Sequence, residues 1–263
     1  MIRCYRTAVY WHSAMPRILR TVVPRIRRSI AERGWLTSLG RGILLPVHLV
    51  RENRATRELS PDGFRSDFDA AHGVHTDGDI EGWTYLSDLE IRSPNWIHGT
   101  NYCAIEPERF SAILASLAID FREFTFIDFG SGKGRALLMA SDYPFRRIVG
   151  LEFAPELHEA AVKNIKSYPR THSGCANVES LCVDFMEFTL PPEPSVLFFF
   201  DPCSEWLLAR VLGKIESSWQ RHPRELWLVC VAPGKKKKLL ESSSFLVKAG
   251  ENEQLQFCWY RNR

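Results

Sequence analysis

The sequence predicts an α/β protein: a doubly wound, mostly parallel sheet with a C-terminal antiparallel hairpin, preceded by a helical and irregular N-terminal extension. From about residue 105, apolar runs of strand length alternate with stretches whose apolar residues recur at helical spacing. This alternation is typical of a parallel sheet with helices on both faces. Three glycines, at positions 130, 132 and 134, follow the first apolar run. Because glycine weakens both helix and strand, this cluster indicates a tight strand-to-helix turn beside a ligand.

The individual elements follow from the same patterns. The parallel strands are expected at residues 124–129, 146–152, 178–184, 195–201 and 225–232. The helices are expected at residues 106–119, 134–143, 155–168 and 204–220, two of them with a proline near the start, which suits a helix N-terminus. The hairpin is expected from runs 245–250 and 254–260, with the turn at GENE, residues 250–253. The lysine run before it predicts a solvated loop.

The part of the chain before the sheet has a different character. We expect residues 1–104 to form an extension and connector, and residues 105–263 to form the ligand-binding domain. Residues 1–60 predict basic helical segments interrupted by prolines 16, 24 and 46, with an amphipathic helix after the last proline. Residues 61–100 are rich in Gly, Asp, His and Ser and predict an irregular connector.

Charge is distributed unevenly along the chain. Residues 1–60 hold twelve arginines and three glutamates, a net charge of +9. The whole chain has a net charge of +3, so the remaining 203 residues carry a net charge of −6. An arm this basic is suited to nucleic acid or to an anionic membrane surface. An arm whose arginines pair with the acidic body explains the same composition, and both interpretations stay open.

The composition limits the setting in which the protein works. Seven cysteines are scattered without a CxxC pair, which favours a reducing compartment over a disulfide framework or a zinc cluster. No apolar run has the length of a membrane span, and the N-terminus lacks a secretory signal, so we expect a cytoplasmic protein. Cys182 and Cys230 lie in apolar runs and are expected to pack as small hydrophobic residues. HGVHTDGD, residues 72–79, matches no standard ligand spacing, so no metal site is expected.

Acidic and glycine residues recur where the predicted parallel strands end, namely Asp128, Gly130, Glu152, Asp184 and Asp201. Carboxyl ends of parallel strands share one edge of a sheet, so these residues predict a ligand crevice there. The triphosphate-binding pattern G-x-x-x-x-G-K-S/T is not matched. The dinucleotide pattern G-x-G-x-x-G is disfavoured, because the third glycine comes one position early, but it stays open.

The stretch D-F-G-S-G-K-G at 128–134 resembles the D-x-G-x-G-x-G motif of the class I, seven-strand, Rossmann-like S-adenosylmethionine-dependent methyltransferases. The resemblance covers about residues 105–262. It implies that S-adenosyl-L-methionine lies against Gly130, Ser131, Gly132 and Gly134. Asp128 would orient the turn or meet the ammonium group, and Lys133 is expected to face solvent.

The same resemblance assigns the rest of the cofactor site. Glu152, which ends the second strand, would accept hydrogen bonds from both ribose hydroxyls, and Phe153 would flank the adenine. Asp184 would accept from the adenine amino group, and Phe185 would pack on the ring.

The acceptor side is indicated by Asp201-Pro202-Cys203. These residues are similar to the D/N-P-P-Y/F motif of methyltransferases that act on planar amino groups, in which the acidic or amide side chain accepts from the target NH₂. Cys203 and Ser204 replace the second proline and the aromatic residue, so the stacking clamp is not matched. Asp201 is the expected catalytic residue, Pro202 and Cys203 are expected to contact substrate, and Trp206 is expected in the core.

A second catalytic candidate lies upstream. Tyr102 followed by Pro107 loosely resembles the segment that precedes the cofactor site in seven-strand protein-lysine methyltransferases. The expected function is therefore S-adenosylmethionine-dependent N-methylation of an unidentified protein or small-molecule acceptor. A nucleotide- or NAD-binding Rossmann-like protein without methyltransferase activity is the first alternative. A cofactor-binding module that its basic arm docks on membrane or nucleic acid is the second.

Overall fold

The computed structural model describes residues 67–79, 82–169, 171 and 173–263. The helical segments expected within residues 1–60, including the amphipathic helix after Pro46, lie outside the described residues. The boundary expected at residue 104 stays a prediction.

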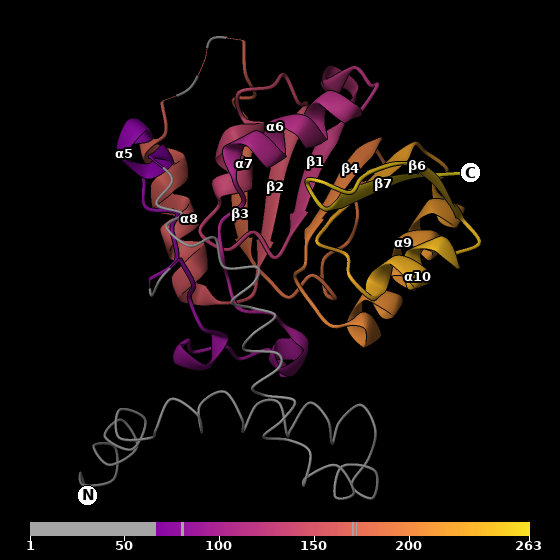
Figure 1. Ribbon diagram of the computed structural model, residues 1–263, viewed down its shortest axis with the longest axis horizontal. Coiled ribbons are helices and arrows are strands. Elements are labelled where there is room, and N and C mark those ends of the chain that lie inside the picture. The colour runs from indigo at the N-terminus through magenta and orange to yellow at the C-terminus, as the bar shows by residue number, and fades with distance from the viewer. Residues whose placement is uncertain (1–66, 80–81, 170, 172) are drawn as a thin grey trace, which may run out of the picture. The chain divides into compact units, whose positions relative to one another are not determined.

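The core of the protein is a seven-stranded sheet with the strand order β3-β2-β1-β4-β5-β7-β6 (Figure 1). The first five strands along the chain are parallel, whereas β7 runs antiparallel to β5 and pairs with β6. The predicted fold class is therefore confirmed. The strands are β1 Thr125–Phe129, β2 Arg147–Glu152, β3 Val178–Cys182, β4 Ser195–Phe200, β5 Leu226–Val231, β6 Leu246–Asn252 and β7 Phe257–Asn262.

Helices cover both faces of this sheet. The α-helices are α5 Phe68–His72, α6 Pro107–Ser116, α7 Arg135–Ala140, α8 Pro155–Ser167, α9 Glu205–Arg221 and α10 Lys236–Glu241. Short 3₁₀ helices span Leu86–Asp88, Pro94–His98 and Phe121–Glu123. Prolines begin α6 and α8, as the sequence predicts, and the Ser204 side chain caps α9.

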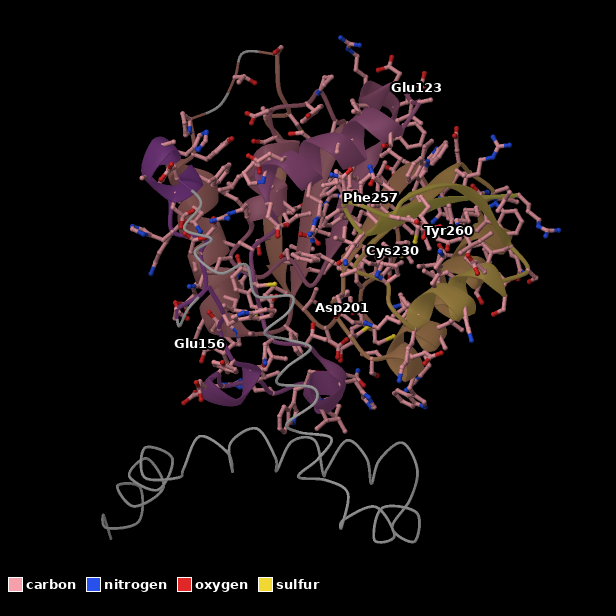
Figure 2. The ribbon with its side chains drawn as sticks, viewed as in Figure 1. Glu123, Glu156, Asp201, Cys230, Phe257 and Tyr260 are labelled. Atoms are coloured by element: carbon pink, nitrogen blue, oxygen red, sulfur yellow. The ribbon has the colours of Figure 1, made fainter. Side chains whose placement is uncertain are left out.

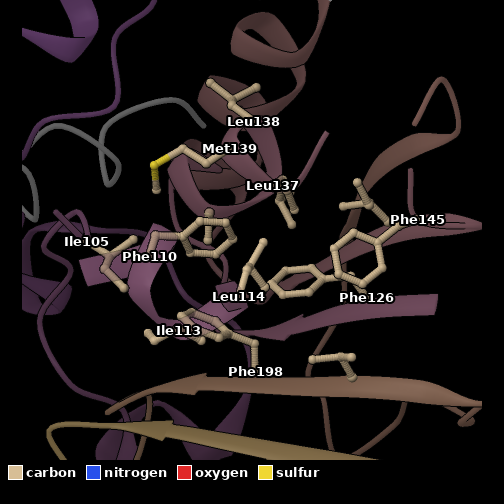
Figure 3. Packing of buried hydrophobic residues seen from close by; sticks show 14 of the residues in the cluster. Ile105, Phe110, Ile113, Leu114, Phe126, Leu137, Leu138, Met139, Phe145 and Phe198 are labelled. Atoms are coloured by element: carbon tan, nitrogen blue, oxygen red, sulfur yellow. The ribbon is translucent and has the colours of Figure 1, made fainter. Parts of the chain in front are cut away.

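Alternate residues of the central strands enter two separate hydrophobic cores. Phe126 and Phe198 pack with Phe110 of α6 on one face (Figure 3). Ile127 and Leu197 pack on the other face with the apolar side of α9. The continuous apolar character of β1 and β4 follows from this burial on both faces.

Two C-terminal elements differ from the sequence prediction. The lysine run begins α10 rather than a solvated loop. The hairpin turn lies between Asn252 and Phe257, because Gly250 belongs to β6 and pairs with Trp259. A Cβ atom on Gly250 would lie 2.2 Å from the Trp259 ring, so this glycine serves close packing rather than the turn.

Two side chains expected to be buried are exposed. Cys182 ends β3, the edge strand of the sheet, and is exposed, whereas Cys230 in β5 is buried as predicted. Trp206 is 43% exposed, because it lies beside the buried stripe of α9 rather than within it.

The connector is fastened to α7 by a buried arginine. Arg135 is 2% exposed, and its guanidinium forms ion pairs with Asp69 at 3.2 Å and Asp77 at 2.6 Å. It also donates to the Thr76 hydroxyl at 2.6 Å and lies 5.0 Å from the centre of the Phe68 ring. The connector residues around α5 are thus part of the folded structure around the glycine turn, and not only a link.

Removing the Arg135 charge should destabilise the protein. Taking one partner from a buried ion pair costs about 3–5 kcal/mol, and we expect about 3 kcal/mol for Arg135→Met because both aspartates retain contact with water. Urea unfolding followed by circular dichroism measures this loss. Arg122→Met is the matched control: its pair with Asp120 is largely exposed, at 73% and 53%, so its removal should cost about 0.5 kcal/mol or less. Equal losses in the two variants would contradict the role of the buried arginine.

Candidate functional site

The glycine cluster forms the predicted turn between β1 and α7. Gly130, Gly132 and Gly134 have φ values of 87°, 54° and 87°, in the left-handed region that favours glycine. The backbone N–H groups of Gly130 and Ser131 donate to the Leu151 carbonyl at 2.9 and 3.1 Å. These bonds fasten the turn to the end of β2.

Side chains from distant parts of the sequence fill the space beside these glycines. A Cβ atom on Gly130 would lie 2.8 Å from Pro202, and one on Gly132 would lie 2.0 Å from the ring of Tyr102. The turn therefore requires glycine for packing against the protein itself. Any larger residue at Gly132 displaces Tyr102, whatever ligand is present.

Two buried carboxyl groups lie next to the turn. Asp128 and Glu152, from the ends of β1 and β2, are each 3% exposed. Glu152 accepts hydrogen bonds from the backbone N–H groups of Gly132 and Ala154, both at 2.8 Å. Within the described residues, the Asp128 side chain has no hydrogen-bond partner.

Burial changes the protonation of both groups. It raises the pKa of Glu152 to about 7, although hydrogen bonds from the backbone of Ala154, Gly132 and Phe153 oppose the shift. Burial and then the Glu152 charge raise the pKa of Asp128 to about 8. Near neutral pH, this pair of carboxyls is a site where a positive charge would be favourable.

The two other side chains of the turn, Ser131 and Lys133, have different surroundings, and the cofactor contact predicted for Ser131 stays a prediction. The Ser131 hydroxyl is buried without a hydrogen-bond partner among the described residues, 2.6 Å from where a Cβ atom on Gly150 would lie. Lys133, expected to face solvent, has a side chain that is only 12% exposed. It pairs with Asp79 at 2.5 Å and donates to the Asp77 carbonyl at 2.9 Å, so it holds the connector against the turn.

The predicted adenine-binding side is packed against the connector. One oxygen of Asp184 accepts from the Ser93 hydroxyl and from Asn95 at 2.7 Å, and the other accepts from the Met186 N–H at 2.8 Å. A carboxylate has about four lone-pair positions, so about one remains for an adenine amino group. The adenine role of Asp184 stays a prediction.

The aromatic residues expected around the adenine are half-buried. Phe153 lies close to Gly99, where an added Cβ atom would be 3.1 Å from its ring. The ring of Phe185 lies 5.9 Å from that of Phe129. Both are positioned at the ends of strands, and their contact with a cofactor stays a prediction.

Asp201, the residue after β4, has a strained backbone conformation. Its φ of 44° is unusual for a residue other than glycine, although aspartate tolerates it better than most. Its backbone carbonyl accepts from the Thr100 hydroxyl at 2.5 Å, and the Thr100 N–H donates to the Pro202 carbonyl at 3.3 Å. Its carboxylate forms an ion pair with Lys236, the first residue of α10. The lysine run supplied no signal for this pair, because charge alone does not reveal which lysine faces inward.

A small pocket lies between this ion pair and the core. It has a volume of about 10 Å³, room for about one water molecule. Asp201 and Cys230, both labelled in Figure 2, lie along it together with Pro202, Cys203 and Lys236. Cys203 is 1% exposed, so its thiol belongs to the wall of the pocket. The assignment of Pro202 and Cys203 as substrate contacts stays a prediction.

Tyr102 lies over the glycine turn, and its hydroxyl donates to the Thr76 carbonyl at 2.6 Å. Burial raises its pKa well above the ordinary value, so the phenol is neutral at physiological pH. In this arrangement Tyr102 packs against the turn, and its catalytic role stays a prediction.

Neither a metal-binding cluster nor a membrane-spanning helix occurs among the described residues. No group of three or more His, Cys, Asp and Glu side chains there is arranged to hold a metal ion. None of the helices in that part of the chain combines the length and the apolar character that crossing a membrane requires.

Comparisons with known proteins concern the fold. No protein-family model matches the sequence, and no curated protein is similar to it. Among solved structures, a tRNA (m1A58) methyltransferase from Aquifex aeolicus is 17% identical, with a TM-score of 0.42 over 74% of this chain and 85% of the other. An RNA methyltransferase from Salinibacter ruber, in complex with S-adenosyl-L-homocysteine, is 19% identical, with a TM-score of 0.39 over 60% and 91%. A precorrin 8w decarboxylase from Methanobacterium thermoautotrophicum is 15% identical, with a TM-score of 0.42 over 62% and 92%.

These TM-scores are too low to establish a shared fold, so the fold assignment rests on the chain's own strand order. Five parallel strands are followed by an antiparallel pair in which β7 lies between β5 and β6. The resemblance drawn from the sequence is confirmed at the level of the fold: the described part of the chain has the seven-strand, Rossmann-like fold of class I S-adenosylmethionine-dependent methyltransferases.

Proposed function

We propose that the protein is an S-adenosylmethionine-dependent methyltransferase that methylates nitrogen. The observation that carries this proposal is the pair of buried carboxyls beside the glycine turn. Asp128 and Glu152 have raised pKa values because their negative charges are costly where they lie. A ligand that brings a positive charge to this place relieves that cost, and S-adenosylmethionine carries both a sulfonium and an ammonium group.

The alternative of NAD or another nucleotide is less well supported by the same residues. A pyrophosphate would place negative charge beside Asp128 and Glu152, which repel it. The N–H of Gly134, the N-cap of α7, already donates to the Ser131 carbonyl at 2.9 Å. One of the donors that a phosphate uses at a helix start is therefore occupied.

The residues present fit the cofactor. Asp128 offers a carboxyl that accepts no hydrogen bond from the described residues, and Glu152 keeps at least one lone-pair position for a ribose hydroxyl. When bound, S-adenosylmethionine supplies an electrophilic methyl group, so that the acceptor's lone pair forms the new bond while the C–S electron pair stays on sulfur. The chain's part is to position and desolvate the acceptor.

Nitrogen is the proposed acceptor atom because of Asp201. Its carboxylate lies at the end of β4, and the adjoining Pro202 packs against Gly130. A carboxylate there accepts a hydrogen bond from an N–H group, directs the nitrogen lone pair, and takes up the proton that nitrogen sheds after methylation. The protein or small molecule that carries this nitrogen is not specified by these residues.

Transfer to an acceptor is the direct test of this function. Purified protein should transfer label from methyl-tritiated S-adenosylmethionine to a component of host lysate, and the product should behave as an N-methyl group. Asp201→Ala should lower turnover by at least about tenfold with an unchanged cofactor dissociation constant, because its partner is the acceptor. Tight binding of NAD without binding of S-adenosylmethionine would contradict the proposal, and label found only in oxygen esters or ethers would contradict nitrogen as the acceptor.

Cofactor affinity should increase with pH. A cation binds best to ionised carboxyls, so binding releases the protons that Asp128 and Glu152 hold below pKa values of about 8 and 7. Between about pH 6 and pH 8 we expect the dissociation constant, measured by calorimetry, to fall by up to about tenfold per pH unit for each proton that binding releases. Asp128→Asn should flatten this dependence. The cofactor ionises in the same way whichever protein it binds. Equal pH profiles of the dissociation constant in the wild-type and Asp128→Asn proteins would therefore rule out Asp128 as the partner of the cofactor's positive charge.

The stability of the free protein should change in the opposite direction. In the unfolded chain, Asp128 and Glu152 lose their protons near the ordinary pKa values of 3.8 and 4.5. In the folded protein they keep these protons to a higher pH, because their pKa values are raised. The free energy of unfolding therefore falls as pH rises from about 5 to about 8, by about 1.4 kcal/mol per pH unit for each such carboxyl. Urea unfolding at several pH values should show this fall, less steeply in Asp128→Asn. The exposed Asp67→Asn is the control that should leave the slope unchanged.

A further inference from the structure

We propose that Ser93 and Asn95, two residues of the connector, make the cofactor site selective for adenine by fixing the carboxylate of Asp184. The proposal rests on the methyltransferase function proposed above, and it extends the cofactor site to a segment that precedes the sheet in the sequence. Ser93 and Asn95 act through Asp184 and are therefore positioning residues.

Asp184 lies beside the strand end that is expected to hold the ribose. Glu152 and Cys182 end β2 and β3 and are opposite each other in the parallel register. The N–H of Val183 donates to the Glu152 carbonyl at 2.9 Å, so the chain leaves β3 next to Glu152. Asp184 is the following residue. We therefore expect a base attached to a ribose held by Glu152 to lie next to Asp184.

Three donors hold the Asp184 carboxylate. One oxygen accepts from the Ser93 hydroxyl and from the side-chain amide of Asn95, the latter at 2.7 Å. The other oxygen accepts from the Met186 N–H at 2.8 Å. Donors on both oxygens oppose rotation of the carboxylate, and the lone-pair position left among the described residues is on the oxygen that Met186 contacts. The side chain therefore presents an acceptor with a fixed direction.

Two of these donors come from the start of one short helix. Ser93 is the N-cap of the 3₁₀ helix Pro94–His98, and its hydroxyl accepts from the Asn95 N–H at 3.0 Å while it donates to Asp184. The Asn95 amide donates to the same carboxylate oxygen. These contacts join residues that are 91 and 89 positions apart in the sequence. The direction of the acceptor therefore depends on how the connector packs against the sheet.

An acceptor with a fixed direction discriminates between purines. The 6-amino group of adenine is a donor, whereas a 6-oxo purine has an acceptor oxygen at the same place. Asp184 is only 8% exposed, so a carbonyl oxygen next to its carboxylate would lack a hydrogen bond and would be repelled. A carboxylate that has lost one of its connector donors can rotate away from that oxygen. Removing either donor should therefore weaken the discrimination.

Binding of two matched ligands tests this inference. Calorimetry gives the dissociation constants of S-adenosyl-L-homocysteine and S-inosyl-L-homocysteine, which differ in the purine 6-substituent. Wild-type protein should bind the adenosyl ligand at least about tenfold more tightly, since a site built around a donor rejects an analogue that lacks it. Asn95→Ala and Ser93→Ala should each lower this ratio to about threefold or less. Ser93→Thr keeps the hydroxyl and should keep the ratio.

Two further variants separate selectivity from folding. Asn101→Ala is the matched control, because the Asn101 side chain fastens the connector to itself by accepting from the Leu86 N–H at 3.2 Å. It should leave the ratio at the wild-type value, even where both affinities fall. Asp184→Asn should abolish the preference, because an amide can donate to a carbonyl oxygen as well as accept from an amino group.

A merely structural role of the connector would lower both affinities together. Equal ratios in Asn95→Ala and Asn101→Ala would therefore overturn the positioning role, and a wild-type ratio in Asp184→Asn would overturn the part assigned to Asp184. Wild-type protein that binds both ligands equally would overturn the inference and leave the methyltransferase function intact. Wild-type protein that binds neither ligand would contradict the methyltransferase function and this inference with it.

Discussion

The arrangement of the site depends on one buried carboxylate, that of Glu152. One of its oxygens accepts from Gly132 in the turn after β1, and the other accepts from Ala154 at the start of α8. The ends of two strands and the start of one helix are thereby held by a single side chain. A buried charge costs free energy unless hydrogen bonds compensate it, so the backbone and the carboxylate stabilise each other.

The glycine turn is shaped as much by the protein as by a ligand. Pro202 occupies the space beside Gly130, and Tyr102 occupies the space beside Gly132. One of these side chains comes from the end of β4 and the other from the connector, and Thr100 joins the two segments through Asp201. The predicted cofactor side and the predicted acceptor side therefore share a wall, and a movement of the connector affects both.

The two sides of the site differ in charge. At the ends of β1 and β2, the pKa values of two buried carboxyls are raised, and no cation among the described residues lowers them. At the end of β4, Lys236 neutralises the carboxylate of Asp201. A cationic cofactor is favoured on the first side. This difference in charge is the physical basis of the proposed function.

The sequence alone determined the parallel sheet, the antiparallel hairpin and the glycine turn. Strands that are buried on both faces need continuous apolar residues, and a left-handed backbone favours glycine, so both features are visible in short stretches of sequence. It placed the hairpin turn too early and took Lys133 and the lysine run for solvated residues, since Gly250, Lys133 and Lys236 owe their roles to partners far away in the chain. Which charges meet, and which are buried, was decided only by tertiary structure. Electrostatic contacts between strand ends depend on strand order, which no local pattern encodes.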